Sequence, residues 1–161
     1  MAVKLASAMG ADVTLFTTSP EKGEDARRLG ADRVVVSRDV EQMTACRNAL
    51  DIIIDCVSAP HDLDPYLASL QTNGRLVLVG IPDRPHTSPD ITPMVFRRLS
   101  ISGSSIGSIQ ETQSMLDFCG KHNITADVEI IDGQEIETAF ARMLRGDIRY
   151  RFVIDMKATR W

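Results

Sequence analysis

The segment TTSPEK, residues 17–22, brings together groups that can bind a phosphate. Thr18 and Ser19 carry hydroxyl groups, and Lys22 adds a positive charge one helical turn later. Ser19 and the proline after it form a helix start, where free backbone N–H groups attract an anion. Two interpretations stay open. The segment is either an anion site, which Glu21 mildly opposes, or a plain helix cap with Lys22 in solvent.

Cys56 and Arg149 are the next candidates for a binding site. Cys56 follows an apolar run, where it forms either a pocket wall or a buried apolar thiol. Nothing marks it as a nucleophile, because no basic neighbour or helix N-terminus is evident. Arg149 stands beside Tyr150 and Arg151 before the last apolar run. It is either ordinary surface charge or a ligand for phosphate groups.

The sequence gives little reason to expect metal chemistry. The three histidines, His61, His86 and His122, are far apart along the chain, and no histidine or cysteine pair has the spacing of zinc ligands. We therefore expect no metal ligands and no catalytic residue, and we place each histidine at the surface. The three cysteines are odd in number and widely separated, which favours reduced thiols.

Short apolar runs predict the strands that position these residues. The four strong runs end at Phe16, Val36, Val57 and Ile81. They are rich in Val, Ile and Leu and mostly do not alternate, which is typical of strands buried on both faces of a parallel sheet. A more polar run at residues 99–107 suits an edge strand, and residues 150–156 form a last strand.

Helical patterns lie between these runs. We expect helices at residues 1–9, 19–29, around 63–70, 108–119 and 136–144. Gly30 suits the position after the second helix, Asn73 with the next glycine closes the third, and Ser108 with Glu111 forms a capping box. The alternation of strands and helices predicts an α/β fold with a doubly wound parallel sheet.

The edge of such a sheet determines where a ligand binds. Ligands lie beyond the carboxyl ends of the strands, which here are followed by TTSPEK (residues 17–22), DCVSAPH (55–61), GIPDRPH (80–86) and SSIGS (104–108). A dinucleotide site that takes NAD has an acidic residue after its second strand, which repels a 2′-phosphate. This chain has hydroxyls and Lys22 there, so the anion-site interpretation of residues 17–22 would mean a pocket for the 2′-phosphate, and hence NADP(H). The glycine turn G-x-G-x-x-G that would hold the pyrophosphate is absent.

Length and charge limit the alternatives. A chain of 161 residues fits one folded domain, and 43% apolar and 25% charged residues are ordinary for a soluble protein. A net charge of −4 does not favour nucleic acid or an anionic membrane as a partner. No apolar run is long enough for a membrane span and no targeting segment is evident, so we expect a cytoplasmic protein.

Seven stretches of the chain together resemble the zinc-dependent medium-chain alcohol dehydrogenases. The branch that they resemble most is that of the cinnamyl-alcohol-dehydrogenase-like, NADP-dependent aldehyde reductases. The stretches are MAVKLASAMGADVT, TTSPEK, LGADRVVVSRD, DIIIDCVSAPHDLDPYL, GRLVLVGIP, ISGSSIGSIQETQSMLDFC and RMLRGDIRYRFVID. They span nearly the whole chain in the family's order.

The resemblance implies a cofactor role for each candidate. Thr18, Ser19 and Lys22 would hold the 2′-phosphate of NADP(H), Arg149 would reach the cofactor phosphates, and Cys56 would lie near the nicotinamide ribose. Two further sets would line the nicotinamide and present backbone to its carboxamide: Val79, Gly80 and Ile81, and Ser104, Ser105 and Ile106 respectively. Residues 99–106 resemble the strand that pairs across the family's dimer axis, which implies a homodimer.

The resemblance also implies which parts of the family's fold are missing. The catalytic domain with its zinc ligands has no counterpart here, nor have the first strand and glycine turn of the cofactor domain. We therefore expect a Rossmann-like sheet that lacks its central strand, with an empty position between the strands that end at Phe16 and Val57. Residues 1–145 would be the truncated dinucleotide-binding domain. Residues 146–161 would hold a strand that belongs, in the family, to the catalytic domain.

The function that the resemblance implies is hydride transfer between NADP(H) and an aldehyde or alcohol. In the parent family zinc polarises the carbonyl, while the cofactor carries the redox step. We expect this chain to be the C-terminal cofactor-binding part of such an enzyme, with weak or absent NADP(H) binding and no activity in isolation. The alternatives are a non-catalytic module that binds nucleotide or dimerises, and an unrelated doubly wound binding domain.

Overall fold

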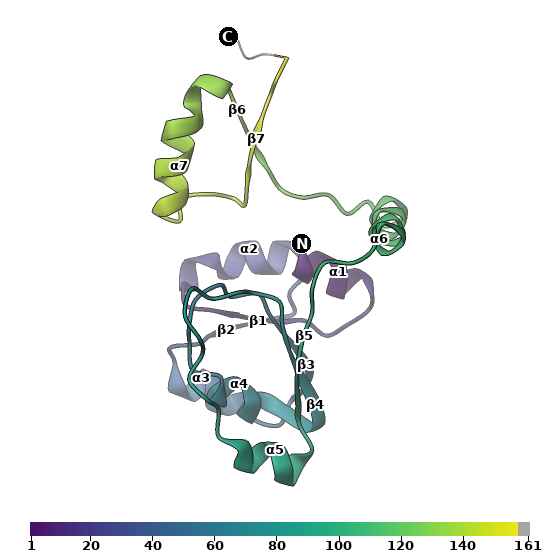
Figure 1. The fold of residues 1–161 in the computed structure, drawn as a ribbon, viewed down its shortest axis with the longest axis vertical. Coiled ribbons are helices and arrows are strands. Elements are labelled where there is room, and N and C mark those ends of the chain that lie inside the picture. Colours follow the sequence, from purple (N-terminus) through teal and green to yellow (C-terminus); the bar gives the residue numbers. More distant parts are fainter. Residues whose placement is uncertain (158–161) are drawn as a thin grey trace.

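The structure is a computed structural model and describes residues 1–157 of the chain (Figure 1). Strands and helices alternate along most of its length, which confirms the α/β class. The elements are α1 (Ala2–Ala8), β1 (Thr14–Thr17), η1 (Pro20–Lys22), α2 (Gly23–Arg28), β2 (Arg33–Val36), α3 (Val40–Ala45), β3 (Leu50–Asp55), α4 (Asp64–Ser69), β4 (Leu70–Leu78), α5 (Ile91–Arg97), β5 (Ser100–Gly103), α6 (Ile109–Lys121), β6 (Glu129–Ile131), η2 (Gly133–Glu135), α7 (Ile136–Leu144) and β7 (Phe152–Ile154).

The strands of the described region form three separate parallel sheets. β1 pairs with β2, β3 and β5 flank β4, and β6 pairs with β7. The first and third strands thus share no hydrogen bonds, as the expected empty position between them predicts. β5 is an edge strand, also as predicted. The β1–β2 pair lies between α2 on one side and α3 and α4 on the other (Figure 1).

Two apolar clusters form the core. The larger one joins β3, α4 and β4 and contains Ile53, Leu63, Leu67, Leu70, Leu76 and Leu99. The smaller one lies between β2 and α3 and contains Val35, Met43 and Cys46. Tyr66 packs against both clusters and therefore connects the two sheets.

The burial of β3 differs from the expectation that the apolar runs are covered on both faces. Ile53 is buried against α4, but Ile52 and Ile54 are 62% and 54% exposed. The side chains of a strand alternate between its two faces, so Ile52 and Ile54 point away from α4. In the part of the chain that the structure describes, nothing covers that face.

The expected helix around residues 63–70 is shorter than predicted. α4 ends at Ser69, because Leu70 adopts an extended conformation and begins β4. Leu70 is fully buried as the first residue of β4. It therefore does not belong to an apolar face of the helix, as its spacing from Leu63 and Leu67 suggested. Asn73 has a positive φ of 67° but lies within β4, where the register with β3 shifts, and not at a helix end.

Several local predictions are confirmed. Gly30 has a φ of 105° after α2, and a Cβ there would lie 2.8 Å from the Cβ of Ser7, so the position suits only glycine. Ser108 and Glu111 form the predicted capping box at the start of α6. Four elements were not predicted: α3, α5, β6 and the short turn η2.

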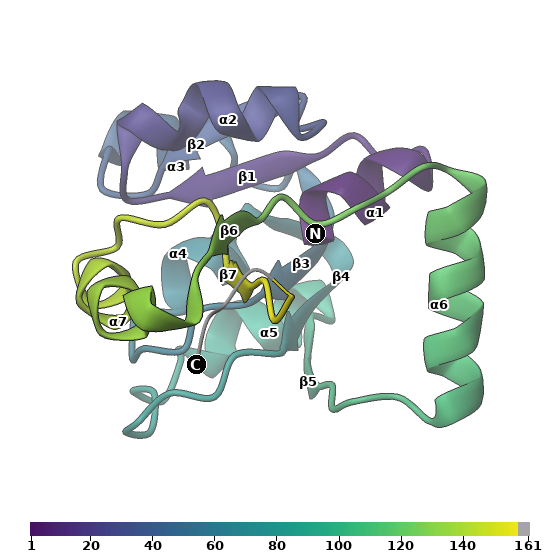
Figure 2. The same ribbon diagram turned by 90° about the horizontal axis from the view of Figure 1, so that it is seen from above.

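The C-terminal elements form a unit that is separate from the main sheets. α7, β6 and β7 lie together at one end, and α6 stands alone at one side (Figures 1 and 2). Arg142 of α7 lies over the ring of Phe152 in β7, 4.9 Å from its centroid, and pairs with Glu129 of β6 at 2.8 Å. Asp127 connects this unit to the main body through Lys4 at 2.5 Å and Arg28 at 3.0 Å.

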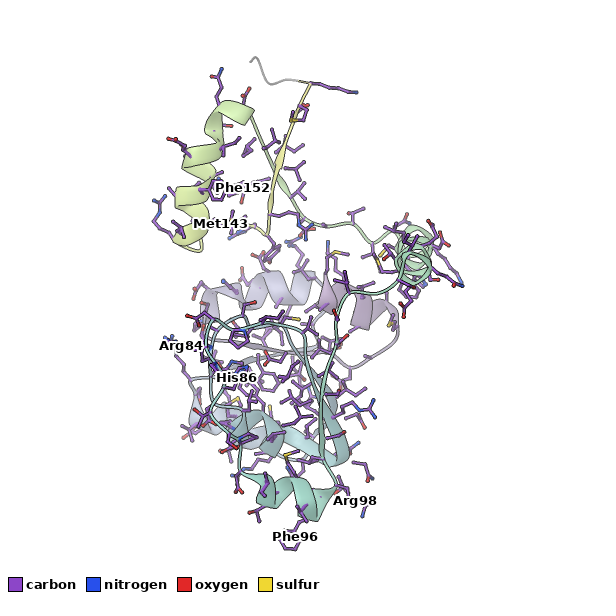
Figure 3. The ribbon with its side chains drawn as sticks, viewed as in Figure 1. Arg84, His86, Phe96, Arg98, Met143 and Phe152 are labelled. Carbon is purple, nitrogen blue, oxygen red and sulfur yellow. The ribbon has the colours of Figure 1, made fainter. Side chains whose placement is uncertain are left out.

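The apolar stripe of α7 is largely uncovered. Ala139 is buried, whereas Phe140, Met143 and Leu144 are 60%, 47% and 89% exposed. Figure 3 shows Met143 next to Phe152. Separately, none of the helices in residues 1–157 is long and apolar enough to cross a membrane.

Candidate functional site

The carboxyl ends of β3, β4 and β5 meet at one edge and bring three of the predicted segments together. The backbone N–H groups of Val79 and Gly80 both donate to the carbonyl oxygen of Asp55, at 2.9 and 3.0 Å. The N–H of Ser104 donates to the carbonyl oxygen of Leu78 at 3.0 Å. The parallel register therefore places Cys56, residues 79–81 and residues 104–106 along one sheet edge.

Gly80 makes this edge possible. A Cβ built at Gly80 would lie 2.3 Å from the carbonyl oxygen of Val57. No real side chain fits such a distance, because an ordinary carbon contact is about 3.5–4.0 Å. The absent side chain thus lets the end of β4 run directly beside the chain that leaves β3.

The side chains on this edge are open to solvent. Val79, Ile81 and Ile106 are 45%, 85% and 96% exposed. Cys56 is exposed as well, so the interpretation as a buried apolar thiol is wrong. It is exposed because β3 ends at Asp55, before the last residues of the apolar run. Apolar groups beside free backbone on a sheet edge suit a flat, partly apolar ligand.

The segment after β1 has the open surface that an anion site needs. Thr18 and Lys22 are exposed, and Ser19 is half-buried. Ser19 occupies the N-cap position of η1 with Pro20 directly after it, although its side chain makes no capping hydrogen bond. Instead, the Thr17 hydroxyl oxygen accepts from the N–H of Ser19 at 3.1 Å. The helix begins as the short turn η1 and then continues as α2.

Arg149 lies beside α2, the helix that follows residues 17–22. Its guanidinium is 3.5 Å from a carboxylate oxygen of Asp25 in α2, and its side chain is 72% exposed. Its backbone N–H donates to Glu129 at 2.9 Å. Burial, with the nearby charge of Asp25, raises the pKa of the adjacent Tyr150. Among the described residues, no hydrogen bond or ion pair joins residues 17–22 or Arg149 to the edge of β3, β4 and β5.

The histidine prediction is partly wrong. His61 and His86 lie side by side, with ring centroids 5.0 Å apart, and both are half-buried. The Nε2 of His61 is 3.3 Å from Oδ2 of Asp55, which is buried. The sequence did contain the signal: each of these histidines follows the end of one of two adjacent strands, β3 and β4. His122 does lie apart, stacked on Phe118 with ring centroids 4.3 Å apart.

Comparisons with known proteins show which family the chain belongs to. A sequence profile described as "Zinc-binding dehydrogenase" matches residues 1–121. Aldehyde reductase YahK of Escherichia coli K12 is 51% identical over 155 residues, which are 96% of this chain and 44% of that protein. Cinnamyl alcohol dehydrogenase 8 of Arabidopsis thaliana is 49% identical over 158 residues, covering 98% of this chain and 44% of that protein.

Solved structures match the fold over almost the whole chain. A cinnamyl alcohol dehydrogenase of Sorghum bicolor matches with a TM-score of 0.94 and 43% identity, over 99% of this chain and 45% of that chain. The cinnamyl alcohol dehydrogenase of Helicobacter pylori, solved with NADP(H), matches with a TM-score of 0.85 and 37% identity, over 99% and 45%. The chain therefore spans less than half the length of these relatives.

Proposed function

The chain belongs to the zinc-binding dehydrogenase family, and on this premise we propose that it is the cofactor-binding part of an NADP-dependent alcohol dehydrogenase or aldehyde reductase. The observation that carries the proposal is the sheet edge at which Cys56, Gly80 and Ser104 come together. It lies at the carboxyl ends of three parallel strands, where an open α/β sheet binds its ligand. The proposed setting is the cytoplasm, and the proposed substrate is an aldehyde or alcohol.

The nicotinamide half of the cofactor would bind on this edge. The exposed side chains of Val79 and Ile81 would cover the apolar face of the ring, with Gly80 allowing close approach. The backbone of Ser104, Ser105 and Ile106 would meet the carboxamide. Cys56 would lie beside the ribose, where its exposed thiol forms part of the pocket wall.

The adenosine phosphate would bind at the segment after β1. Thr18, Ser19 and Lys22 would hold the 2′-phosphate through hydroxyls and one positive charge. Arg149 would reach the cofactor phosphates, for which it would have to leave Asp25. That exchange costs little, because the arginine is 72% exposed and exposed ion pairs contribute little to stability.

The cofactor supplies the hydride chemistry when it is bound, and the residues of this chain bind and orient it. The described cysteines do not fit a cysteine-rich zinc site. Cys46 is buried in the core beside Met43, Cys119 is buried near Met115, and Cys56 is exposed at the sheet edge. We therefore assign no catalytic residue and no zinc-dependent step to this chain.

A second candidate is a non-catalytic module that pairs through β5. Among residues 1–157, β5 has a hydrogen-bonded strand on one side, β4, so its other edge is open to pairing with a further strand. Pairing of two copies through residues 99–106 would form a homodimer. A dimer measured by sedimentation, with no NADPH binding, would favour this candidate over the first.

A binding titration tests the proposed function. NADPH and NADH are titrated into the purified chain, and binding is followed by the change in nicotinamide fluorescence. We expect NADPH to bind more tightly than NADH, although weakly. Lys22→Ala should remove that preference, whereas Lys121→Ala at the end of α6 should keep it. Equal affinities for the two cofactors, or a preference that persists in Lys22→Ala, would contradict the assignment.

A further inference from the structure

We propose that Asp55, His61 and His86 form a binding site for a divalent transition-metal ion, with Zn²⁺ as the best-fitting probe. Each residue offers one ligand atom, and these atoms lie within 4.8 Å of one another. Two imidazoles and a carboxylate form a donor set that zinc and related ions prefer over magnesium or calcium. This proposal does not depend on cofactor binding.

The Asp55 carboxylate is fixed in place for this role. The residue is 8% exposed and lies at the end of β3. Its Oδ1 accepts the N–H of Val57 at 2.9 Å. Its other oxygen, Oδ2, is directed at the Nε2 of His61, 3.3 Å away. A buried carboxylate is stable only when paired or coordinated, so this second oxygen requires a positive partner.

The geometry of His61 shows which of its nitrogens is free to bind an ion. Its Nδ1 is 3.0 Å from the carbonyl oxygen of Ala59. A carbonyl only accepts, so Nδ1 carries the proton in this contact and the lone pair of a neutral ring is on Nε2. Metal-binding histidines commonly donate their second N–H to a backbone carbonyl in this way.

A lone pair that faces a carboxylate oxygen is unfavourable unless a cation lies between them. A divalent metal ion in this place would bind both atoms. The 3.3 Å between Nε2 and Oδ2 is the separation of two ligands about 2.0–2.1 Å from a tetrahedral ion, which works out at about 3.3 Å. The pair therefore has the spacing of two zinc ligands before any ion is bound.

His86 completes the set from the loop between β4 and α5. Figure 3 shows its side chain on the inner side of that loop, whereas Arg84 points outward. The Nδ1 of His86 is 3.3 Å from the carbonyl oxygen of His61, which ties the loop to the site. A bound ion would draw its ring inward by side-chain rotation, because ligand atoms at one ion are about 3.3 Å apart.

The site is accessible from solvent. A cavity of about 440 Å³ opens beside it, lined by His61, Asp62, Asp64, Thr87 and residues next to them. Such a cavity leaves space for water, which completes the coordination of a three-ligand zinc site. Of the three ligands, His61 lines this cavity, so an ion in the cavity reaches the site at His61.

Zinc titration of the full chain tests the proposal. The chain is treated with chelator, dialysed and titrated with Zn²⁺ by calorimetry, and the thermal midpoint is measured with and without Zn²⁺ or Mg²⁺. We expect one Zn²⁺ per chain and a midpoint that Zn²⁺ raises but Mg²⁺ does not, because an ion that binds only the folded state stabilises it. His61→Gln and His86→Gln should each weaken zinc binding tenfold or more.

Two matched variants complete the design. His122→Gln changes a histidine outside the site, and Cys56→Ser removes the nearby thiol, so both should bind zinc as the wild type does. Loss of zinc binding in Cys56→Ser would overturn the assignment, because the thiol would then be the ligand. Unchanged binding in both site variants would also overturn it. A wild-type midpoint that does not move when Zn²⁺ is added would also overturn the proposal.

Discussion

Phe16 and Tyr66 meet edge to face, with ring centroids 5.4 Å apart and planes at 82°. Phe16 belongs to β1 and Tyr66 to α4, so this contact crosses between two sheets that share no hydrogen bond. Tyr66 also meets His61 edge to face at 5.6 Å, which places the aromatic pair directly beside the proposed metal site. The pair therefore connects the β1–β2 sheet to the part of the molecule that holds the candidate site.

The coupling between these two rings is measurable. Phe16→Leu, Tyr66→Leu and the double variant are compared by urea unfolding. We expect a coupling free energy of about 0.5–1.5 kcal/mol, which is usual for an edge-to-face pair. As a control, Phe16 packs against the smaller core cluster whereas Phe118 in α6 stacks on His122, so Phe16→Leu and Phe118→Leu should be additive within about 0.5 kcal/mol. Additive effects of Phe16→Leu and Tyr66→Leu would show that the contact does not hold the sheets together.

Replacement of Gly80 by alanine should destabilise the fold. The new Cβ would lie 2.3 Å from the Val57 carbonyl oxygen and 2.9 Å from the carbonyl carbon of Cys56, and both are backbone atoms. We expect a loss of about 1–3 kcal/mol in the free energy of unfolding, as for other overpacked sites. Gly120→Ala is the control, because nothing lies within 4 Å of a Cβ there. Within α6 it should stabilise by roughly 0.5–1 kcal/mol. A neutral Gly80→Ala would mean that the two strand ends separate easily.

Acid should weaken the contact between the C-terminal unit and the main body. Hydrogen bonds from Lys4 and then Arg28 hold the pKa of Asp127 below its ordinary value of 3.8. A carboxyl group whose pKa is lower in the folded state contributes stability above its unfolded pKa and loses it as the pH falls through the folded pKa. We therefore expect Asp127→Asn to reduce the acid dependence of unfolding below about pH 4.

The control for this measurement is Asp83→Asn. Asp83 is exposed and its distance to Arg84 is 3.7 Å, so its removal should leave the pH profile unchanged. The wild-type slope will persist in part in Asp127→Asn. The backbone N–H of Arg149 and then the Arg142 side chain lower the pKa of Glu129, and Arg142 also lowers the pKa of Asp147. Identical profiles for the wild type and Asp127→Asn would contradict the expected role of Asp127.

The purified 161-residue chain should not turn over substrate. We assign it residues that orient a cofactor and none that act on an aldehyde. In a mixture of NADPH, Zn²⁺ and an aromatic or aliphatic aldehyde, the absorbance of NADPH should fall no faster than without protein. Turnover above that background would overturn this prediction and would require a catalytic group within these residues.

Much of the fold could be predicted because its signals are local. Short apolar runs predicted β1 to β5, and Gly30 and the Ser108 capping box marked a helix end and a helix start correctly. α3 and α5 escaped prediction because they are six and seven residues long. Two turns are too few to show a stripe, and α5 begins within a proline-rich segment. Leu70 was wrongly assigned to a helix. Its spacing from Leu63 and Leu67 is helical, but it is the first residue of β4.

The site was predicted less completely, for a different reason. Cys56, Gly80 and Ser104 could be placed on one edge because each follows a parallel strand. The meeting of His61 and His86 depends on the paths of two loops, and neither path has a periodic signal. Their separation by 25 positions therefore seemed large, although the ends of their strands are adjacent. The exposure of Ile52 could not be predicted either. Whether a strand is buried on one face or on both depends on which helices cover the sheet, and the sequence of the strand does not contain that information.

The position of β4 between β3 and β5 has a consequence for the order in which parts of the molecule unfold. In residues 1–157, it is the one strand with hydrogen-bonded neighbours on both sides, and its Leu76 is buried in the larger cluster. Each amide proton that β4 donates to a neighbour is protected until the strand that accepts it separates, and both of these strands belong to the sheet that holds the larger cluster. The β6–β7 pair, with three residues in each strand and exposed apolar neighbours in α7, can open without disturbing β4. Local unfolding should therefore begin at the C-terminal unit and reach the edge that carries Gly80 last.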